Sequence, residues 1–243
     1  MENDFEKWLF SDEGQRFYAI EQQRIAQVSC MMSGTHGVQL GLAQVANLLE
    51  DISVSDQLHV LNGEREGGSA ALSQLDRLVL AESDALPFKN NEFNVVLAPH
   101  LVELNNDPQA ALREIYRVTA PEGLVLLTGL NPYSLLGIQA LWPKSHYRFG
   151  QKLALARMKD WLNLLGFDIV AGNLFQYALL GANPDSKLTK MTESVGDRWL
   201  PMTAGAYLLL VRKRIFGQTI IGRAALKKFS SRRMPKPVSL KQD

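Results

Sequence analysis

The sequence predicts an α/β fold built on a parallel sheet, and three features in its middle carry this prediction. Short apolar runs at 78–81, 94–98 and 124–128 are rich in Val and Leu, which is typical of strands buried on both faces. Between the last two runs, segment 107–118 places apolar residues at three- and four-residue steps, the spacing of one helix face. Turn residues at 121–123 then return the chain to the sheet. Strand, helix and strand in this order form a crossover between parallel strands.

Upstream of this unit, the sequence predicts two more strands and three helices. Apolar residues at helical spacing favour a helix over 13–32, which a Ser-Gly pair ends. The apolar run 38–42 is the expected first strand, and a short helix over 44–49 follows it. The run 58–61 is the expected second strand, followed by a short helix over 70–75.

The C-terminal half continues the same alternation with two interruptions. The periodicity predicts an amphipathic helix over 153–165 and a strand over 167–170. A last strand is expected over 206–211, antiparallel and at the edge of the sheet. The aromatic segment 133–150 is either a substrate lid or a packing cover, because loops on such scaffolds often carry specificity. The polar segment 182–201 is expected to be an insertion.

Composition narrows the class of protein. The chain has 243 residues, 46% of them apolar, which is enough for one large α/β domain. A single cysteine, Cys30, excludes an internal disulfide framework and favours a reducing compartment. No apolar run is long enough to span a bilayer, and no basic-then-apolar leader opens the chain. We therefore expect a cytoplasmic protein without a transmembrane segment.

Charge is unevenly distributed along the chain. The formal net charge is only +1, but residues 212–243 hold ten Lys and Arg against one acid. The globular part, expected to span 1–211, is therefore acidic, and the C-terminal tail is basic. A basic tail of this kind is either solvated or in weak contact with RNA or anionic lipid.

The segment 82–132 resembles the middle of class I S-adenosylmethionine-dependent methyltransferases of the type 11 domain kind. Three motifs carry the resemblance: Asp84-Ala85 followed by Leu-Pro-Phe, the Phe-Asn-Val-Val strand at 93–96, and the Leu-x-Glu-x-x-Arg-Val helix at 112–118. The resemblance implies a Rossmann-like three-layer sandwich with a mostly parallel seven-stranded sheet whose last strand is antiparallel. It also implies S-adenosylmethionine as cofactor and a small molecule as methyl acceptor.

The first cofactor motif of that family is only partly present here. Members carry an acid on the first strand and then a loop with three glycines, which let the backbone approach the methionine part of the cofactor. In this chain Gln39 stands at the acid position and Gly41 at the first glycine. Ala43 and Val45 replace the other two glycines, which puts cofactor affinity in question without affecting the fold. The alternative is a plain strand-to-helix turn.

The resemblance assigns the remaining cofactor contacts to two later loops. Asn62 is the better placed candidate for the ribose hydroxyls, since its amide offers both a donor and an acceptor, and Glu64 is the alternative. Asp84 and the backbone amide of Ala85 match the adenine-binding position, and Phe88 is expected to wall the purine. The alternative for Asp84 is a residue that only caps a turn.

His100 is the one candidate for a catalytic base. It follows the strand at 94–98, and open parallel sheets bind ligands beyond the carboxyl ends of their strands. With an ordinary pKa of about 6.5, a histidine there can deprotonate a hydroxyl. The competing interpretation is a buried histidine with its hydrogen bonds satisfied by neighbours. Glu103 follows three residues later without a second histidine, so a metal-assisted mechanism is not supported.

Three functions remain open on the sequence alone. The first is methyl transfer from S-adenosylmethionine to a small molecule. The second is a non-catalytic relative that has lost cofactor binding and acts through a protein partner, and the third is RNA binding or modification through the tail. The sequence does not favour a dinucleotide-binding oxidoreductase, a P-loop protein or a zinc protein. It has no G-x-G-x-x-G after its first strand, no P-loop and no zinc-type Cys/His cluster.

Overall fold

The computed structural model describes residues 4–9, 11–41, 47–61, 77–134, 153–175 and 204–214. Several expectations lie outside these residues and are untested by the fold: the helix over 70–75, the insertion at 182–201, most of the aromatic segment, and Asn62, Ala43 and Val45 among the cofactor-loop positions. Of the expected helix over 44–49, residues 47–49 are described and form part of a turn.

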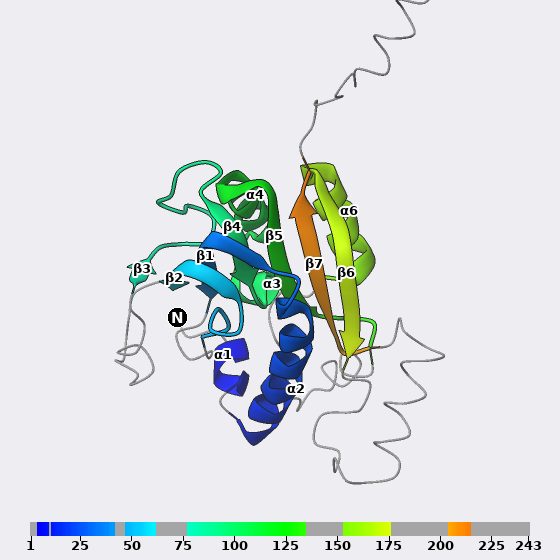
Figure 1. Ribbon diagram of the computed structural model, residues 1–243. Coiled ribbons are helices and arrows are strands. Elements are labelled where there is room, and N and C mark those ends of the chain that lie inside the picture. Colours follow the sequence, from blue (N-terminus) through cyan, green and yellow to red (C-terminus); the bar gives the residue numbers. More distant parts are fainter. Residues whose placement is uncertain are drawn as a thin grey trace, which may run out of the picture.

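The described residues form one seven-stranded sheet with the order β3-β2-β1-β4-β5-β7-β6 (Figure 1). Its strands are β1 (Ser33–Gly41), β2 (Ser53–Leu61), β3 (Leu78–Leu80), β4 (Phe93–Ala98), β5 (Thr119–Leu130), β6 (Phe167–Phe175) and β7 (Ala206–Lys213). The helices are α1 (Asp4–Leu9), α2 (Asp12–Ser29), α3 (Leu101–Leu104), α4 (Pro108–Val118) and α6 (Leu155–Leu165). The expected α/β sandwich with a mostly parallel seven-stranded sheet is confirmed.

The direction of the last strand is confirmed, but its expected place is wrong. Strands β3, β2, β1, β4 and β5 pair in parallel, whereas β7 runs antiparallel to β5. β7 lies between β5 and β6, so the edge of the sheet is β6. Every residue of β7 but one is buried, because its side chains alternate between the cores on the two faces of the sheet, with Leu208 and Leu210 in one of them. A strand with apolar side chains on both faces fits an interior position better than an edge.

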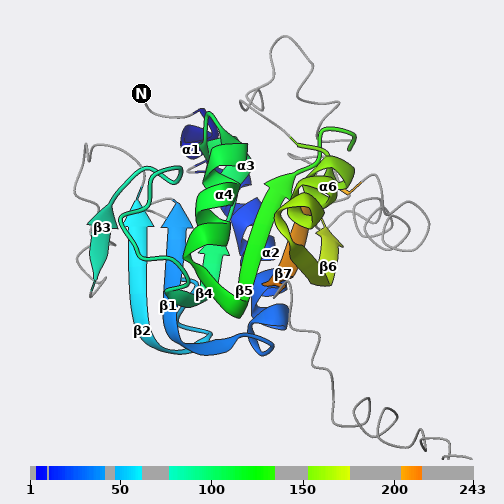
Figure 2. The same ribbon diagram turned by 90° about the horizontal axis from the view of Figure 1, so that it is seen from above.

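Helices cover both faces of the sheet and complete the three layers. Successive residues of a strand point to opposite faces, so Val95 and Leu97 lie in one core while Val96 and Ala98 lie in the other. The first core is closed by α1 and α2, and the second by α4 and α6. Figure 2 shows α4 and α6 on one side of the strands and α2 on the other.

Helix α4 forms where local signals agree. Asp107 is its N-cap, and its carboxylate accepts a hydrogen bond from the Ala110 N–H at 2.9 Å, while Pro108 occupies the first turn. The apolar stripe that predicted the helix is fully buried against the sheet; it consists of Ala111, Leu112, Ile115 and Val118. This burial fixes the opposite, polar face of α4 relative to the loops around it.

The N-terminal helices form a hairpin that reaches the carboxyl ends of the strands. Ser11 caps α2 by accepting from the Gly14 N–H at 3.1 Å. A side chain at Gly14 would clash, because its Cβ would lie 2.2 Å from the Trp8 carbonyl oxygen. The close approach lets Phe5 and Trp8 pack into the core beneath α1.

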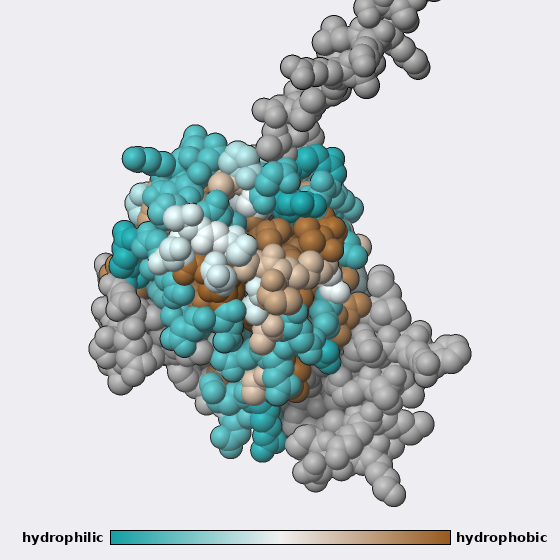
Figure 3. Space-filling view, in the orientation of Figure 1, coloured by the Kyte–Doolittle hydropathy of each residue, from teal (hydrophilic) through white to brown (hydrophobic). Residues whose placement is uncertain are grey.

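The surface is polar over α2 and apolar towards β7 and β6. Figure 3 shows brown surface over that side of the sheet, where the edge strand β6 exposes Ile169 and Val170. Within the part of the chain that the structure describes, no helix combines the length and the apolar character needed to cross a membrane.

Candidate functional site

A cleft opens at the carboxyl ends of β1 and β4, where parallel α/β sheets bind their ligands. Its described walls come from the end of β1, the loop after β3, the end of β4 and helix α3. The lining residues are Leu40, Gly41, Ser83, Ala98, Pro99, Leu101, Leu104 and Asn105. The empty space among these residues is about 160 Å³, part of it open solvent, and it is too narrow to hold a water molecule. Segments 42–46 and 62–76, which directly follow β1 and β2, lie outside the described residues.

Gly41 ends β1 in a backbone conformation that suits glycine. Its φ angle is +126°, a region that L side chains rarely adopt. A Cβ there would make ordinary van der Waals contact with Leu104 Cδ1 at 3.6 Å and with the Pro99 carbonyl oxygen at 3.8 Å, so the backbone angle and not a lack of space favours glycine. The predicted cofactor residue Gly41 borders the cleft.

Gln39, which stands at the acid position of the family motif, is buried two residues earlier. Its side-chain oxygen accepts a hydrogen bond from the Leu48 N–H at 2.9 Å. Asn47 connects the same turn to β2, with 2.9 Å between its Oδ1 and His59 Nε2. The uncharged side chain of Gln39 therefore holds the turn at Leu48, which follows β1, where a family member would have a carboxylate.

The loop after β3 holds the expected adenine-binding residues, and Ser83 is the one that reaches the cleft. Ser83 is buried, whereas Asp84 and Ala85 are exposed beside it. The Ala85 N–H donates to the Glu82 carbonyl oxygen at 3.0 Å and closes a turn. Phe88 is half-buried and packs edge-on against Phe93, with ring centroids 5.0 Å apart. Ser83 was not predicted, because a serine after a strand carries no specific signal.

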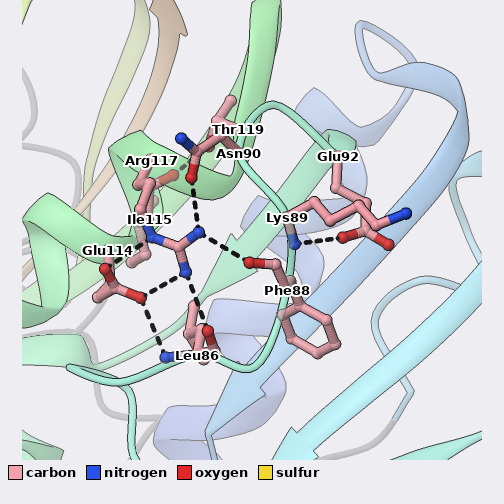
Figure 4. A network of polar contacts seen from close by, with 9 residues as sticks. All are labelled: Leu86, Phe88, Lys89, Asn90, Glu92, Glu114, Ile115, Arg117 and Thr119. Atoms are coloured by element: carbon pink, nitrogen blue, oxygen red, sulfur yellow. Dashed lines mark hydrogen bonds and ion pairs between the residues drawn. The ribbon is translucent and has the colours of Figure 1, made fainter.

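Helix α4 holds the next part of this loop through an ion pair (Figure 4). Glu114 and Arg117 lie one turn apart, and Arg117 Nη2 donates to Glu114 Oε2 at 2.8 Å. The guanidinium also donates to the carbonyl oxygens of Leu86 and Phe88 at 2.9 and 2.7 Å. In return, Glu114 accepts from the Leu86 N–H at 3.0 Å. The hydrogen-bonded pair lowers the pKa of Glu114 and raises the pKa of Arg117, so that both stay charged.

His100 lies at the same end of the sheet but faces away from the cleft. It adopts left-handed backbone angles, φ 51° and ψ 34°, and its N–H donates to Thr128 Oγ1 at 3.1 Å. Its ring is 2% exposed and packs 4.6 Å from the Phe5 ring under α1. Pro99 thus lines the cleft while the next side chain enters the core on the α1–α2 side.

Two buried carboxylates surround the His100 ring. Nε2 lies 3.0 Å from Glu21 Oε2, and Nδ1 lies 3.8 Å from Glu103 Oε2, an ion-pair distance but too long for a hydrogen bond. Burial opposes a charge on the ring, yet the adjoining carboxylates of Glu21 and Glu103 outweigh it and raise the pKa of His100 to about 10. At neutral pH the ring is therefore an imidazolium.

Glu103 connects this cluster to the ends of two strands. Its Oε1 accepts from the Leu130 N–H at 2.5 Å, at the end of β5. Burial, and next the negative charge of Glu103, raise the pKa of Tyr207 on β7, which keeps that phenol neutral. The geometry favours the interpretation of His100 as a buried, charge-satisfied histidine, because a base must be neutral and reachable. Glu21 is 79 residues away in sequence, so the sequence alone did not reveal the cluster.

Comparison with known proteins reveals similarity to methyltransferases. A sequence model of the methyltransferase domain matches residues 41–127. A malonyl-[acyl-carrier protein] O-methyltransferase of Erwinia billingiae is 32% identical over 136 residues, covering 50% of this chain and 54% of that protein. An uncharacterized Escherichia coli protein, YafS, is 30% identical over 147 residues, covering 59% and 57%. The chain thus spans about half the length of these curated relatives.

Solved structures with the same fold cover more of the chain at lower identity. A Haloferax volcanii methyltransferase in complex with the activator Trm112 aligns with a TM-score of 0.60 and 16% identity, over 88% of this chain and all of that one. A Thermotoga maritima S-adenosylmethionine-dependent methyltransferase gives 0.57 and 17%, over 85% and 96%. The [4+2]-cyclase SpnF gives 0.53 and 17%, over 80% of each chain. The shared fold therefore does not by itself fix the reaction.

Proposed function

We propose that this chain, whose residues 41–127 match a methyltransferase domain, is a class I S-adenosylmethionine-dependent methyltransferase that transfers a methyl group to an anionic oxygen of a small or carrier-bound acyl molecule. When bound, the cofactor supplies a methyl group on a positively charged sulfur. The acceptor class is suggested by the relatives named as malonyl-[acyl-carrier protein] O-methyltransferases, since a malonyl group ends in a carboxylate.

The observation that carries this proposal is the positive φ of Gly41, which ends β1 at the wall of the cleft. A backbone that a ligand can approach closely fits the methionine end of the cofactor. In the proposal Asp84, Ala85 and Phe88 bind the adenine side, and Asn62 the ribose. Ser83 joins them, because it is buried where the loop meets the cleft.

The chain's own part in the chemistry is alignment and exclusion of water. Of the residues described around the cleft, none carries a side chain that titrates near neutral pH. An acceptor that is already an anion needs no base, so positioning alone lowers the barrier. A role for His100 as base requires the ring to lose its proton and to become accessible. In this proposal His100 instead balances the two carboxylates beside it.

Calorimetry with S-adenosylmethionine and S-adenosylhomocysteine tests the proposal directly. Wild-type protein is expected to bind both, and Gly41→Val to lose binding while it remains folded by circular dichroism. Transfer of a labelled methyl group to a malonyl-loaded carrier protein then tests the acceptor. A folded wild-type protein that releases no heat at millimolar cofactor refutes the assignment.

A second candidate function rests on Ala43 and Val45, which replace glycines of the cofactor loop. Under this candidate the chain keeps the fold, has lost cofactor binding, and acts through a protein or RNA partner. Substituting glycine at both positions separates the candidates. A large gain in cofactor affinity favours the second candidate, whereas unchanged binding favours the first.

A further inference from the structure

We propose that Glu114 and Arg117 are positioning residues of the cofactor site, which set cofactor affinity by fixing the loop after β3. This inference rests on the proposed function, because it concerns the same cleft. Neither side chain lines the described part of the cleft; both act through the backbone of Leu86 and Phe88. These two side chains and their contacts with residues 86–90 form the Glu114–Arg117 clamp.

The clamp uses the full hydrogen-bonding capacity of the guanidinium. An arginine has five N–H donors in a planar fork. In Arg117, Nε donates one hydrogen bond, to Glu114 Oε1, and Nη1 and Nη2 donate two each (Figure 4). Three of the five contacts reach the loop, at the carbonyl oxygens of Leu86 and Phe88 and at Asn90 Oδ1. The loop is therefore held in one position by directional bonds.

The clamp stands on a helix whose own position does not depend on it. The apolar stripe of α4 is buried on the other side of the helix, and its end is tied by the Asn91 N–H to the Arg117 carbonyl oxygen at 2.9 Å. The Glu92 N–H likewise donates to the Val118 carbonyl oxygen at 2.8 Å. Removing the Arg117 side chain leaves these contacts intact, so the helix is expected to stay while residues 86–90 move.

The clamped segment continues directly into the cleft. Leu86 is buried against the α4–α6 side of the sheet, and three residues earlier Ser83 forms part of the cleft wall. A shift of the Leu86 backbone is therefore transmitted through one tight turn, which the Ala85-to-Glu82 hydrogen bond closes, to the wall itself. Asp84 and Ala85, the proposed adenine contacts, lie inside that turn.

Stability alone does not account for the clamp. The Arg117 and Glu114 side chains are 31% and 20% exposed, so water screens their ion pair in part and reduces its contribution to folding. Water can replace the lost contacts at the carbonyl oxygens of Leu86 and Phe88, which are only partly buried. Loss of the Arg117 contacts is expected to displace the loop without unfolding the protein. Cofactor affinity should therefore fall more strongly than the melting temperature.

Arg117→Lys tests the inference, because it keeps the charge and removes the fork. A lysine has three donors on one nitrogen and cannot reach Glu114 and two carbonyl oxygens at once. We expect the dissociation constant for S-adenosylhomocysteine to rise about tenfold, which corresponds to about 1.4 kcal/mol. In a transfer assay the KM for the cofactor rises similarly, while kcat at saturating cofactor stays within about twofold.

Arg77→Lys is the matched control. Arg77 also pairs with a carboxylate, Asp56, but lies just before β3 at the opposite end of the strands. Hydrogen exchange gives a readout independent of activity: the Leu86 amide is expected to exchange faster in Arg117→Lys and at the wild-type rate in Arg77→Lys.

The outcomes separate the inference from the function on which it rests. If wild-type protein binds the cofactor and Arg117→Lys binds it equally well, the inference is wrong and the proposed function stands. If wild-type protein does not bind, the proposed function fails and the inference fails with it. Two other results also overturn the positioning role. One is an equal loss of cofactor affinity in Arg77→Lys, and the other is a fall in kcat of Arg117→Lys without a change in cofactor affinity.

Discussion

Replacing His100 by glutamine is expected to destabilise the protein strongly at neutral pH and to flatten its pH dependence. In the native protein the pKa of His100 is raised to about 10, against about 6.5 in an unfolded chain. A folded-state pKa above the unfolded value means that the stabilisation is fully present below about pH 6.5 and disappears as the pH rises towards 10. The variant lacks this pH-dependent contribution.

The magnitude follows from two independent considerations. The difference between the two pKa values sets an upper limit of about 5 kcal/mol, at about 1.4 kcal/mol per pH unit. Removing one partner of a buried ion pair costs about 3–5 kcal/mol, because the remaining charge is left unpaired. Here two carboxylates would remain, on Glu21 and Glu103, both almost fully buried. A loss of about 3–5 kcal/mol in the free energy of unfolding is therefore expected.

Urea unfolding at several pH values between 6 and 10 measures both effects. His36→Gln is the control, since His36 also lies beside a carboxylate, Asp56 at 3.2 Å, but is 48% exposed. This surface change is expected to stay within about 0.5 kcal/mol. Glu21→Gln combined with His100→Gln should recover part of the loss, because it also removes one buried charge. A His100→Gln protein as stable as wild type, or with the wild-type pH dependence, would refute the reasoning.

Three further predictions address other parts of the chain. Lys213→Met is expected to lower the free energy of unfolding by about 1–3 kcal/mol, measured by urea unfolding, because Nζ donates to Asn91 Oδ1 and to the carbonyl oxygens of Tyr116 and Thr119, each at 2.7 Å. Asp84→Ala is expected to weaken S-adenosylhomocysteine binding about tenfold in calorimetry with little change in melting temperature, since the side chain is exposed; unchanged affinity would exclude it from the site. Truncation after Arg214 is expected to abolish any RNA retention that falls steeply with salt; retention by the truncated chain would place RNA contacts elsewhere.

The elements that the sequence predicted well are those with local signals. The helix over 107–118 had a cap, a proline in its first turn and an uninterrupted apolar stripe, and α4 follows them residue by residue. The basic tail was placed from 212 onwards, yet β7 continues through Lys213, whose amine is buried among three acceptors. Arg214 in turn donates its N–H to the Gly166 carbonyl oxygen. Their positive charge led to the prediction that these residues belong to the tail. Only their contacts with distant residues show that they belong to the sheet.

Position within the sheet and the surroundings of His100 depend on contacts between distant segments. Strand periodicity does not distinguish an edge from the interior next to it, so β7 was expected in the place that β6 occupies. His100 was expected in the cleft because it follows β4, and β4 does end at the cleft. Its left-handed conformation turns the ring towards Phe5 and Glu21 instead. No local pattern encodes that turn, since the residues that stabilise it come from α1, α2 and β5.

If the cofactor binds in the cleft as proposed, its site is separate from the buried titratable groups, and this separation limits which acceptors can react. Gly41 presents backbone without a side chain to the cleft at the end of β1, while the titratable groups at the ends of β4 and β5 are paired with one another in the core. An alcohol acceptor would need one of those groups as a base, whereas a carboxylate is ionised above about pH 4. Methyl transfer to a carboxylate should therefore proceed at a rate that is flat between about pH 6 and 8. A rate that rises tenfold per pH unit in this range would require a base and would return His100 to the reaction.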